Sequence, residues 1–283
     1  MKVGIDSYSF HRFFGELTKW ESPCAEQWET SDFLDFLAEN DVTLASLQTS
    51  YLDPKHQKLE TDLRNWLGED RSRELLFTWG HPNGLDGGRR PEGLENALDF
   101  LRLSQALGAN QMRIVLGNHW NFDTEPEERF ALLRPLLMKI LEVANEYQIR
   151  ISIENHADFP VRKLMNFIDS FTDPLLGMCL DLGNATRVGD NPITLLQEFN
   201  VGSIFMVQVK DVRRIPGQEH PTGWWPTVLF GTGDVDPGQC VQILKSKGFQ
   251  DPLVIEISNV FTGLSEKEVT LSALAYLRGL LAN

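Results

Sequence analysis

The 283-residue chain contains only three cysteines, Cys24, Cys179 and Cys240, which are widely spaced. An odd number of distant cysteines makes no disulfide framework and suits a reducing compartment. No stretch approaches the roughly 20 apolar residues of a membrane helix. Asp6 and His11 interrupt the segment where a secretory signal needs an unbroken apolar run. We therefore expect a cytoplasmic protein that does not enter membranes.

Basic residues are scarce: 26 Lys and Arg stand against 40 Asp and Glu, which gives a formal charge of −14 and a pI near 4.9. A protein with this negative net charge repels the phosphate backbones of nucleic acids and anionic lipids. Nucleic acid and membrane surfaces are therefore excluded as expected partners, although local basic patches can still bind small anions. The hydrophobic content of 42% and the charged content of 23% are ordinary for a globular protein and exclude a disordered chain.

Eight short β-rich runs recur along the chain, several of them almost continuously apolar, as in strands buried on both faces of a parallel sheet. They span residues 2–10, 42–48, 75–80, 111–117, 150–155, 177–183, 204–211 and 252–258. Between and after them, apolar residues recur at helical spacing in segments 33–40, 94–110, 129–147 and 271–283. The sequence thus alternates strand and helix eight times.

Eight strand–helix units of about 35 residues each predict an α/β protein with a single (β/α)8 TIM barrel spanning residues 1–283. A doubly wound open sheet shows the same alternation, but such sheets often carry a glycine-rich phosphate loop after the first strand, and this chain has none there. No linker or low-complexity segment divides the chain. We therefore predict one domain.

Several helix starts carry capping signals. Asn191 and Asp236 each precede a proline at the first helical position. Ser265 and Thr124 are each followed three residues later by a glutamate, the pattern of a capping box. These signals predict where four helices begin.

Four polar side chains interrupt apolar strands near their carboxyl ends, where barrels of this kind place their active sites. They are Glu154, Asp181, Gln208 and Glu256. Carboxylates crowded at one barrel mouth repel each other, so either some take up protons or a divalent metal neutralises them. Oxygen ligands favour one Mn²⁺ or Mg²⁺ ion, with Co²⁺ or Zn²⁺ as alternatives. The simpler alternative is that each acid forms a salt bridge with a neighbour.

Cationic and imidazole groups also gather at or just past the strand ends. We expect the substrate to be bound by His81, His119, His156, Asn184, Lys210, Arg213 and Arg214. Arg187 follows the sixth strand, and this concentration of positive charge suits a substrate with a carboxylate or phosphate. Taken singly, each arginine is expected more often in a surface salt bridge with one of the 40 acidic residues than at a substrate. Arg113, inside the fourth strand, is expected to be a buried charge partner rather than a substrate ligand.

Two long loops, residues 11–30 and 212–231, are rich in aromatic residues. Loops of this length in a compact domain are usually functional or disordered, and aromatic density argues against disorder. They are predicted either to cover the barrel mouth or to form a subunit interface. We expect a homo-oligomer, either a dimer or a tetramer.

Four motifs resemble the xylose-isomerase-like TIM-barrel superfamily, which includes sugar epimerases, hydroxypyruvate isomerase, inosose dehydratase and dehydroshikimate dehydratase. The motifs are Glu154-Asn155-His156, Asp181-Leu182-Gly183-Asn184, Gln208-Val209-Lys210-Asp211 and Ile255-Glu256, with a Gly-x-Gly-x-x-Asp run at 231–236. The resemblance implies that Glu154, Asp181, Gln208 and Glu256 bind one divalent metal and that the two glutamates act as acid and base. Gln208 and Asn184 stand where sugar epimerases usually have histidine.

The resemblance implies a metal-dependent isomerase or epimerase acting through an enediolate on a small ketose or keto sugar acid. A metal-dependent decarboxylase or dehydratase of an oxo sugar acid is the close alternative, because residues 5–15 resemble the 3-oxo-isoapionate decarboxylase branch. A non-catalytic sugar-binding barrel is disfavoured by the intact glutamate pair. A DNA-repair nuclease related to endonuclease IV is disfavoured by the six histidines and the acidic charge.

Overall fold

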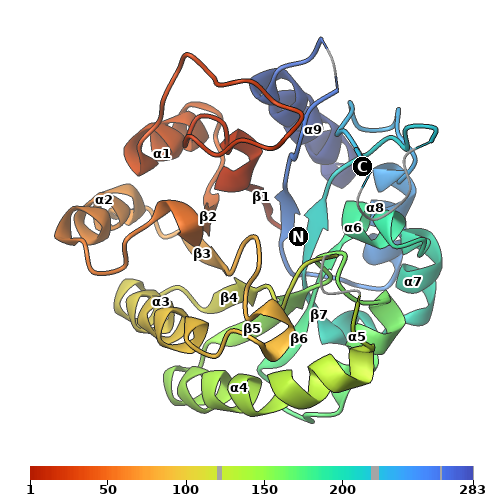
Figure 1. Ribbon diagram of the computed structural model, residues 1–283. Helices are drawn as coiled ribbons and strands as arrows, with labels where there is room; N and C mark the ends of the chain where they lie inside the picture. Colours follow the sequence, from red (N-terminus) through yellow and green to blue (C-terminus); the bar gives the residue numbers. More distant parts are fainter. Residues whose placement is uncertain (120–122, 218–222, 262, 283) are drawn as a thin grey trace.

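The computed structural model describes residues 1–119, 123–217, 223–261 and 263–282. Eight parallel strands form a closed barrel in chain order, with helices around it (Figure 1). The strands are β1 (Val3–Asp6), β2 (Leu44–Gln48), β3 (Glu74–Trp79), β4 (Gln111–Ile114), β5 (Arg150–Glu154), β6 (Leu176–Asp181), β7 (Ile204–Val209) and β8 (Leu253–Ile255). Because β1 pairs with both β2 and β8, the sheet has no free edge. The predicted TIM barrel is confirmed, and the open sheet is excluded.

The helices follow the strands in rotation, and the segments predicted from their periodicity correspond to α1, α3, α4 and α9. Their bounds are α1 (Thr30–Glu39), α2 (Gln57–Leu67), α3 (Gly93–Leu107), α4 (Pro126–Tyr147), α5 (Val161–Asp169), α6 (Leu182–Arg187), α7 (Pro192–Glu198), α8 (Pro237–Ser246) and α9 (Glu266–Ala282). The connection from β6 to β7 holds two short helices, α6 and α7, where the strand–helix alternation predicted one.

The apolar core has two parts because strand side chains alternate between the barrel interior and the surrounding helices. The larger part lies between the strands and the helices. The smaller part fills the barrel interior and consists of Leu44, Leu76, Cys179, Met206 and Val254. On these five strands, β2, β3, β6, β7 and β8, a polar side chain follows the cluster residue toward the carboxyl end.

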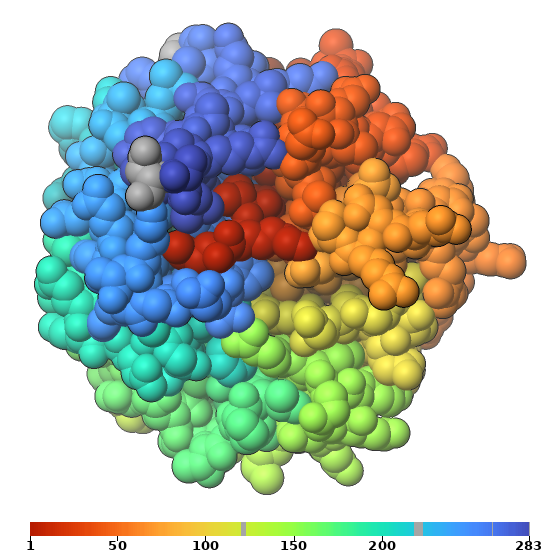
Figure 2. Space-filling model, turned by 180° about the vertical axis from the view of Figure 1, so that it is seen from behind, coloured from red at the N-terminus to blue at the C-terminus, as the bar shows by residue number. Residues whose placement is uncertain are grey.

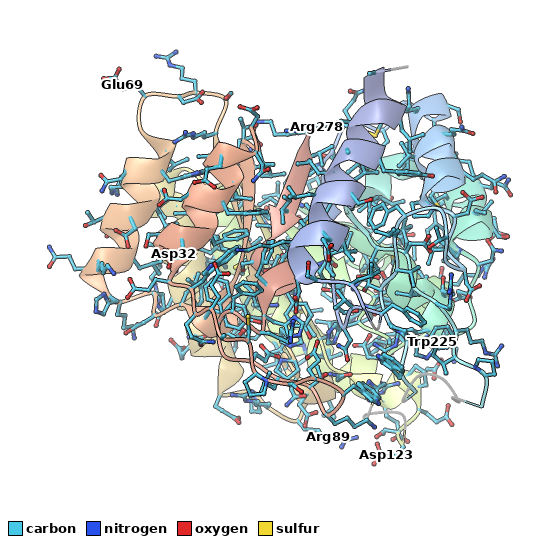
Figure 3. All side chains as sticks on the ribbon, turned by 90° about the horizontal axis from the view of Figure 1, so that it is seen from above. Asp32, Glu69, Arg89, Asp123, Trp225 and Arg278 are labelled. Atoms are coloured by element: carbon cyan, nitrogen blue, oxygen red, sulfur yellow. The ribbon has the colours of Figure 1, made fainter. Side chains whose placement is uncertain are left out.

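All eight carboxyl ends lie at the same end of the barrel, because the strands are parallel. Figure 3 shows the molecule from the side, with Arg89, Asp123 and Trp225 at this end and Glu69 and Arg278 at the other. Figure 2 shows the opposite, amino-terminal end, where the first residues, in red, lie at the centre. Among the described residues, no helix combines the length and the apolar character needed to cross a bilayer.

Candidate active site

Every strand carries a buried polar residue at, or one position from, its carboxyl end. These residues form a polar layer above the interior apolar cluster, and each is at most 4% exposed: Asp6, Gln48, Thr78, Arg113, Glu154, Asp181, Gln208 and Glu256. Burying such polar groups costs free energy unless they form hydrogen bonds or ion pairs with one another or bind a ligand. The layer therefore marks the floor of the candidate site.

Three of the predicted metal ligands meet in this floor. Glu154, Asp181 and Glu256 each offer a carboxylate oxygen, and these oxygens lie within 4.8 Å of one another. The amide nitrogen of the fourth, Gln208, donates to Glu256 at 2.6 Å, while its Oε1 accepts from the thiol of Cys179 at 3.2 Å. The four residues that the sequence singled out are thus neighbours in space.

Two buried cations lie among these carboxylates. Arg113 Nε is 3.0 Å from Glu154 Oε2, and Arg113 Nη2 is 3.7 Å from Glu256 Oε1. Lys210 Nζ is 2.8 Å from Asp181 Oδ2 and also forms an ion pair with Glu256. Arg113 is therefore a buried charge partner, as predicted, and Lys210 bridges two of the acids.

Burial and these neighbours move the pKa values of the carboxyl groups in different directions. Desolvation raises the pKa of Glu154 to about 8 and the pKa values of Asp6 and Asp181 to about 6. Burial also opposes the ionisation of Glu256, but Lys210 and Arg113 outweigh it and hold the pKa of that carboxyl below its ordinary value. The two glutamates are thus pushed toward opposite protonation states.

The donor set fits a divalent ion that prefers oxygen ligands. Glu154 Oε2 and Asp181 Oδ2 are buried and accept no hydrogen bond from the described residues, although each lies within 3.0 Å of a cationic nitrogen. When ionised, the four buried carboxylates of the layer exceed the two buried cations, Arg113 of the layer and the adjacent Lys210, by two negative charges. A divalent cation would neutralise this excess.

Two asparagines orient the acids. Asn184 donates its side-chain amide to Glu154 Oε1 at 3.0 Å and its backbone N–H to Asp181 Oδ1 at 2.7 Å. The side chain of Asn155 pairs with both the N–H and the carbonyl of Asp181, at 2.7 and 2.9 Å. The motifs at 154–156 and 181–184 therefore lock two neighbouring strand ends together.

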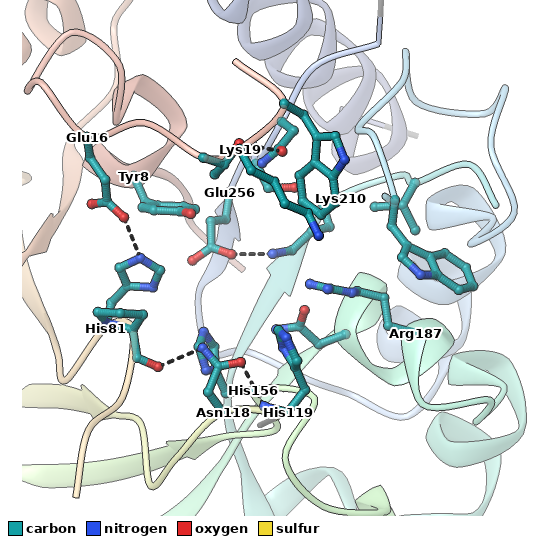
Figure 4. Close-up of a pocket in the computed structure, with 18 of the residues that line it drawn as sticks. Tyr8, Glu16, Lys19, His81, Asn118, His119, His156, Arg187, Lys210 and Glu256 are labelled. Carbon is teal, nitrogen blue, oxygen red and sulfur yellow. Dashed lines mark hydrogen bonds and ion pairs between the residues drawn. The ribbon is translucent and has the colours of Figure 1, made fainter. Parts of the chain in front are cut away.

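A cavity of about 600 Å³ opens above the floor (Figure 4). Five of the predicted substrate-binding residues line it: His81, His119, His156, Asn184 and Lys210. His156 Nδ1 lies 2.9 Å from the carbonyl oxygen of Gly117, and burial lowers the pKa of this imidazole well below its ordinary value. His156 is therefore a neutral group of the cavity wall.

Two predicted residues, Arg213 and Arg214, are not among the described residues that line this cavity. Arg213 donates its guanidinium to the carbonyl of Thr232 at 2.6 Å, and the backbone N–H of Arg214 donates to Asp234 at 2.6 Å. Val212 still lines the cavity and forms an antiparallel bridge with Thr227, and the chain leaves the mouth after it. Their expected role in substrate binding is therefore not supported by their position.

Both aromatic loops contribute to the cavity. Its lining includes Glu16, Leu17, Thr18, Lys19 and Trp20 from the first loop and Gly223 and Trp225 from the second. Residues 218–222 of the second loop lie outside the described residues. Two ion pairs hold the first loop: Glu16 lies 2.8 Å from His81, and Glu21 lies 2.9 Å from His11. We call residues 11–29 the cover loop.

Sequence reasoning missed several cavity residues. Tyr8 and Asn118 line the cavity shortly after β1 and β4, positions that the strand-end rule could have found. Lys19 and Trp20 lie far from any strand end in the sequence and carried no such signal. Arg187 was noted only for its charge, and it also lines the cavity.

The fold and this site together indicate the family of proteins to which the chain belongs. Residues 14–280 match the family of xylose isomerase-like TIM barrels, and the chain belongs to that family.

Among curated proteins, the chain is 26% identical over 176 residues to L-ribulose-5-phosphate 3-epimerase UlaE of Escherichia coli O1:K1 / APEC. This match covers 61% of the chain and 58% of that relative. The same enzyme of Salmonella typhi is 24% identical over the same length.

Solved structures share the fold over the whole chain. An IolI protein with a bound zinc atom superimposes with a TM-score of 0.73 at 15% identity, covering 100% of this chain and 98% of that one. An L-ribulose 3-epimerase gives a TM-score of 0.73 at 16% identity, covering 100% of this chain and 95% of that one. At these identities the likeness concerns the fold alone.

Proposed function

We propose that the protein is a divalent-metal-dependent isomerase or epimerase that acts on a small ketose or keto sugar acid through an enediolate. The observation that carries the proposal is the convergence of Glu154, Asp181 and Glu256 at the floor of a cavity of about 600 Å³, a size suited to a small sugar. The relatives named L-ribulose-5-phosphate 3-epimerase support sugar chemistry. The zinc atom in the IolI structure supports a divalent ion in this family.

Glu154, Asp181, Gln208 and Glu256 would hold the ion, which when bound supplies Lewis acidity next to a substrate carbonyl. Lys210 and Arg113 favour the ionised form of Glu256, so this carboxylate is placed to remove a proton from the carbon beside the carbonyl. Glu154, whose carboxylate oxygen lies within 4.8 Å of that of Glu256, is placed to exchange a second proton with the substrate. Arg113 contacts both glutamates and fixes their separation.

The metal site is tested by metal content, measured by mass spectrometry on wild-type protein and on Asp181→Ala. We expect about one divalent ion per chain in the wild type and loss of that ion in the variant. Asp158→Asn is the control, because Asp158 is equally buried but does not belong to the cluster of converging carboxylates. Absence of a bound ion, with no stabilisation by added Mn²⁺ or Mg²⁺, would refute the proposal.

The enediolate is tested by solvent deuterium. Ketoses recovered after incubation with the metal-loaded enzyme in D₂O are expected to carry deuterium at the carbon next to the carbonyl. Glu256→Gln should slow this exchange about 10²–10⁴-fold, the usual contribution of a general base. Full exchange in the variant would exclude Glu256 as the base.

Decarboxylation of an oxo sugar acid is the second candidate. It is favoured by the cationic residues Lys19 and Arg187 on the cavity wall, since that reaction requires a carboxylated substrate. Release of carbon dioxide from such a substrate, without deuterium exchange into ketoses, would favour this candidate over isomerisation.

A further inference from the structure

The carboxylates that line the cavity already have partners, and its wall carries cationic side chains. Two of its described lining residues are carboxylates, Glu16 and Glu256, and each already has a cationic or imidazole partner: His81 for Glu16, and Lys210 for Glu256. Arg113 is likewise paired with Glu154 in the floor. Both carboxylates among the described lining residues are thus engaged, one at the floor and one at the base of the cover loop.

The residues that line the cavity also include Lys19, His119 and Arg187, and we call these three the cationic wall. Arg187 is the last residue of α6, and Lys19 comes from the cover loop, so the two cations reach the cavity from different parts of the fold. Figure 4 shows the Arg187 side chain extending from α6 into the cavity, below the cover loop that carries Lys19. Lys19 Nζ lies 4.4 Å from the centre of the Trp20 ring, which orders its side chain at the mouth.

Arg187 and Lys19 both lie close enough to His119 for their positive charges to affect its pKa. Burial, followed by the positive charges of Arg187 and Lys19, lowers the pKa of His119 to about 4. Burial likewise lowers the pKa of Arg187, against the smaller opposing effects of Asp181 and Tyr8. A desolvated guanidinium and an ammonium beside a neutral imidazole make a region that an anion stabilises.

We propose that Arg187 and Lys19 bind an anionic group of the substrate, a carboxylate or a phosphate ester. This group would lie at the cavity wall, above the carboxylates of Glu154, Asp181 and Glu256, which we call the carboxylate floor. The inference rests on the proposed function and narrows its substrate class from ketoses in general to anionic sugars. Arg187 supplies a planar donor pair suited to either anion. Lys19 adds a charge that the cover loop carries, so the anion is held by both the barrel and the loop.

Anion binding is therefore linked to the position of the cover loop. Its Glu16–His81 and Glu21–His11 pairs and the hydrogen bond from Thr18 Oγ1 to Asn259 Oδ1, 2.9 Å long, place Lys19 over the cavity. A neutral ketose can form no ion pair with this segment. The specificity for an anion thus comes from two residues outside the carboxylate floor.

Calorimetric titration of the full chain, dialysed against chelator, tests this inference with ribulose, ribulose 5-phosphate and ribonate. We expect the wild type to bind one of the two anionic probes at least about tenfold more tightly than ribulose, as charge-assisted hydrogen bonds predict. Arg187→Gln should remove most of this preference and leave the affinity for ribulose within about twofold. Arg187→Lys should retain part of it, and Lys19→Gln should weaken it. The tighter anion identifies the group as phosphate or carboxylate.

Arg213→Gln is the matched control, because Arg213 also follows a strand end but does not line the cavity. It should keep the wild-type preference. Equal affinity of the wild type for all three probes, or an undiminished preference in both Arg187→Gln and Lys19→Gln, overturns the inference. Deuterium exchange into ribulose by the metal-loaded enzyme, without any anion preference, would refute this inference and leave the proposed function intact. Anion preference without metal binding or exchange would refute the proposed function instead.

Discussion

At the scale of single residues, Lys210 controls the charge of the floor. Its ammonium pairs with both Asp181 and Glu256, so two acids that would repel each other share one cation. A buried ion pair gains little net stability over an apolar pair, but removing one partner leaves an uncompensated charge. Lys210 thus allows the carboxylate floor to fold before any metal binds.

Replacing this lysine tests that role. Lys210→Met should destabilise the chelator-treated protein by about 3–5 kcal/mol, measured by urea unfolding, because Asp181 and Glu256 lose their shared cation. Added Mn²⁺ should restore part of the loss. Lys163→Met, which removes an exposed pair with Glu127, should leave the urea midpoint unchanged. Similar midpoints for the two variants would contradict this role.

The raised pKa of Glu154 predicts how the stability of the metal-free protein depends on pH. Folding moves this pKa from 4.5 to about 8, so between these values the folded chain holds a proton that the unfolded chain releases. Stability of the metal-free protein should therefore decrease as pH rises from 5 to 8. Glu154→Gln removes this contribution, so thermal unfolding should show a shallower decrease in Tm over the same range. Equal slopes for wild type and variant would show that Glu154 ionises normally.

At the scale of helices, local chemistry sets most starts. The side chain of Asn191 accepts the N–H of Thr194 at 3.1 Å at the start of α7, and Asp236 caps α8 in the same way. The Ser265–Glu268 box precedes α9, as predicted. The box predicted at Thr124 is wrong: α4 begins at Pro126 after Glu125, and the Thr124 hydroxyl contacts Asp123 and Arg89 instead.

This contrast gives a matched pair of substitutions. Asn191→Ala should lower the free energy of unfolding by about 1 kcal/mol, because it removes the cap of α7. Thr124→Ala removes a hydroxyl that caps no helix, so it should change that energy by less than about 0.5 kcal/mol. Urea unfolding of both variants checks the difference. A larger effect at Thr124 would mean that its contacts with Arg89 and Asp123 matter more than the cap.

At the scale of the whole molecule, closure of the barrel leaves little room near its amino-terminal end. A Cβ atom at Gly4 in β1 would lie 2.7 Å from Leu44 Cγ, and one at Gly177 in β6 would lie 2.7 Å from the ring of Phe205. The adjacent strands cannot part without breaking the closed ladder. Glycine at these positions therefore permits closure rather than a turn.

Gly4→Ala should destabilise the protein by about 1–3 kcal/mol through overpacking. Gly279→Ala is the control: a Cβ atom there meets nothing within 4 Å in α9, so the higher helix propensity of alanine should stabilise the protein by up to about 1 kcal/mol. Urea unfolding distinguishes the two variants, because the free energy of unfolding should fall for Gly4→Ala and rise for Gly279→Ala. Equal effects would mean that the barrel relaxes around the added methyl group.

The gathering of Glu154, Asp181, Gln208 and Glu256 could be predicted because it follows from two local facts. Each residue ends a buried run, and parallel strands in a barrel bring their carboxyl ends together. The same rule correctly placed His81 and His156 at the cavity. It failed for Arg213 and Arg214, because the path of a long loop depends on distant partners such as Thr232 and Asp234.

The sequence by itself determined the barrel, the starts of α7, α8 and α9 and the four polar residues at the ends of β5 to β8, since periodicity and capping act over a few residues. Only the tertiary structure decided that Arg113 and Lys210 share the buried acids, and that Lys19 and Arg187 line the same cavity. These arrangements join residues from different strands, helices and loops. They depend on barrel closure and on long-range packing, which no local pattern of side chains encodes.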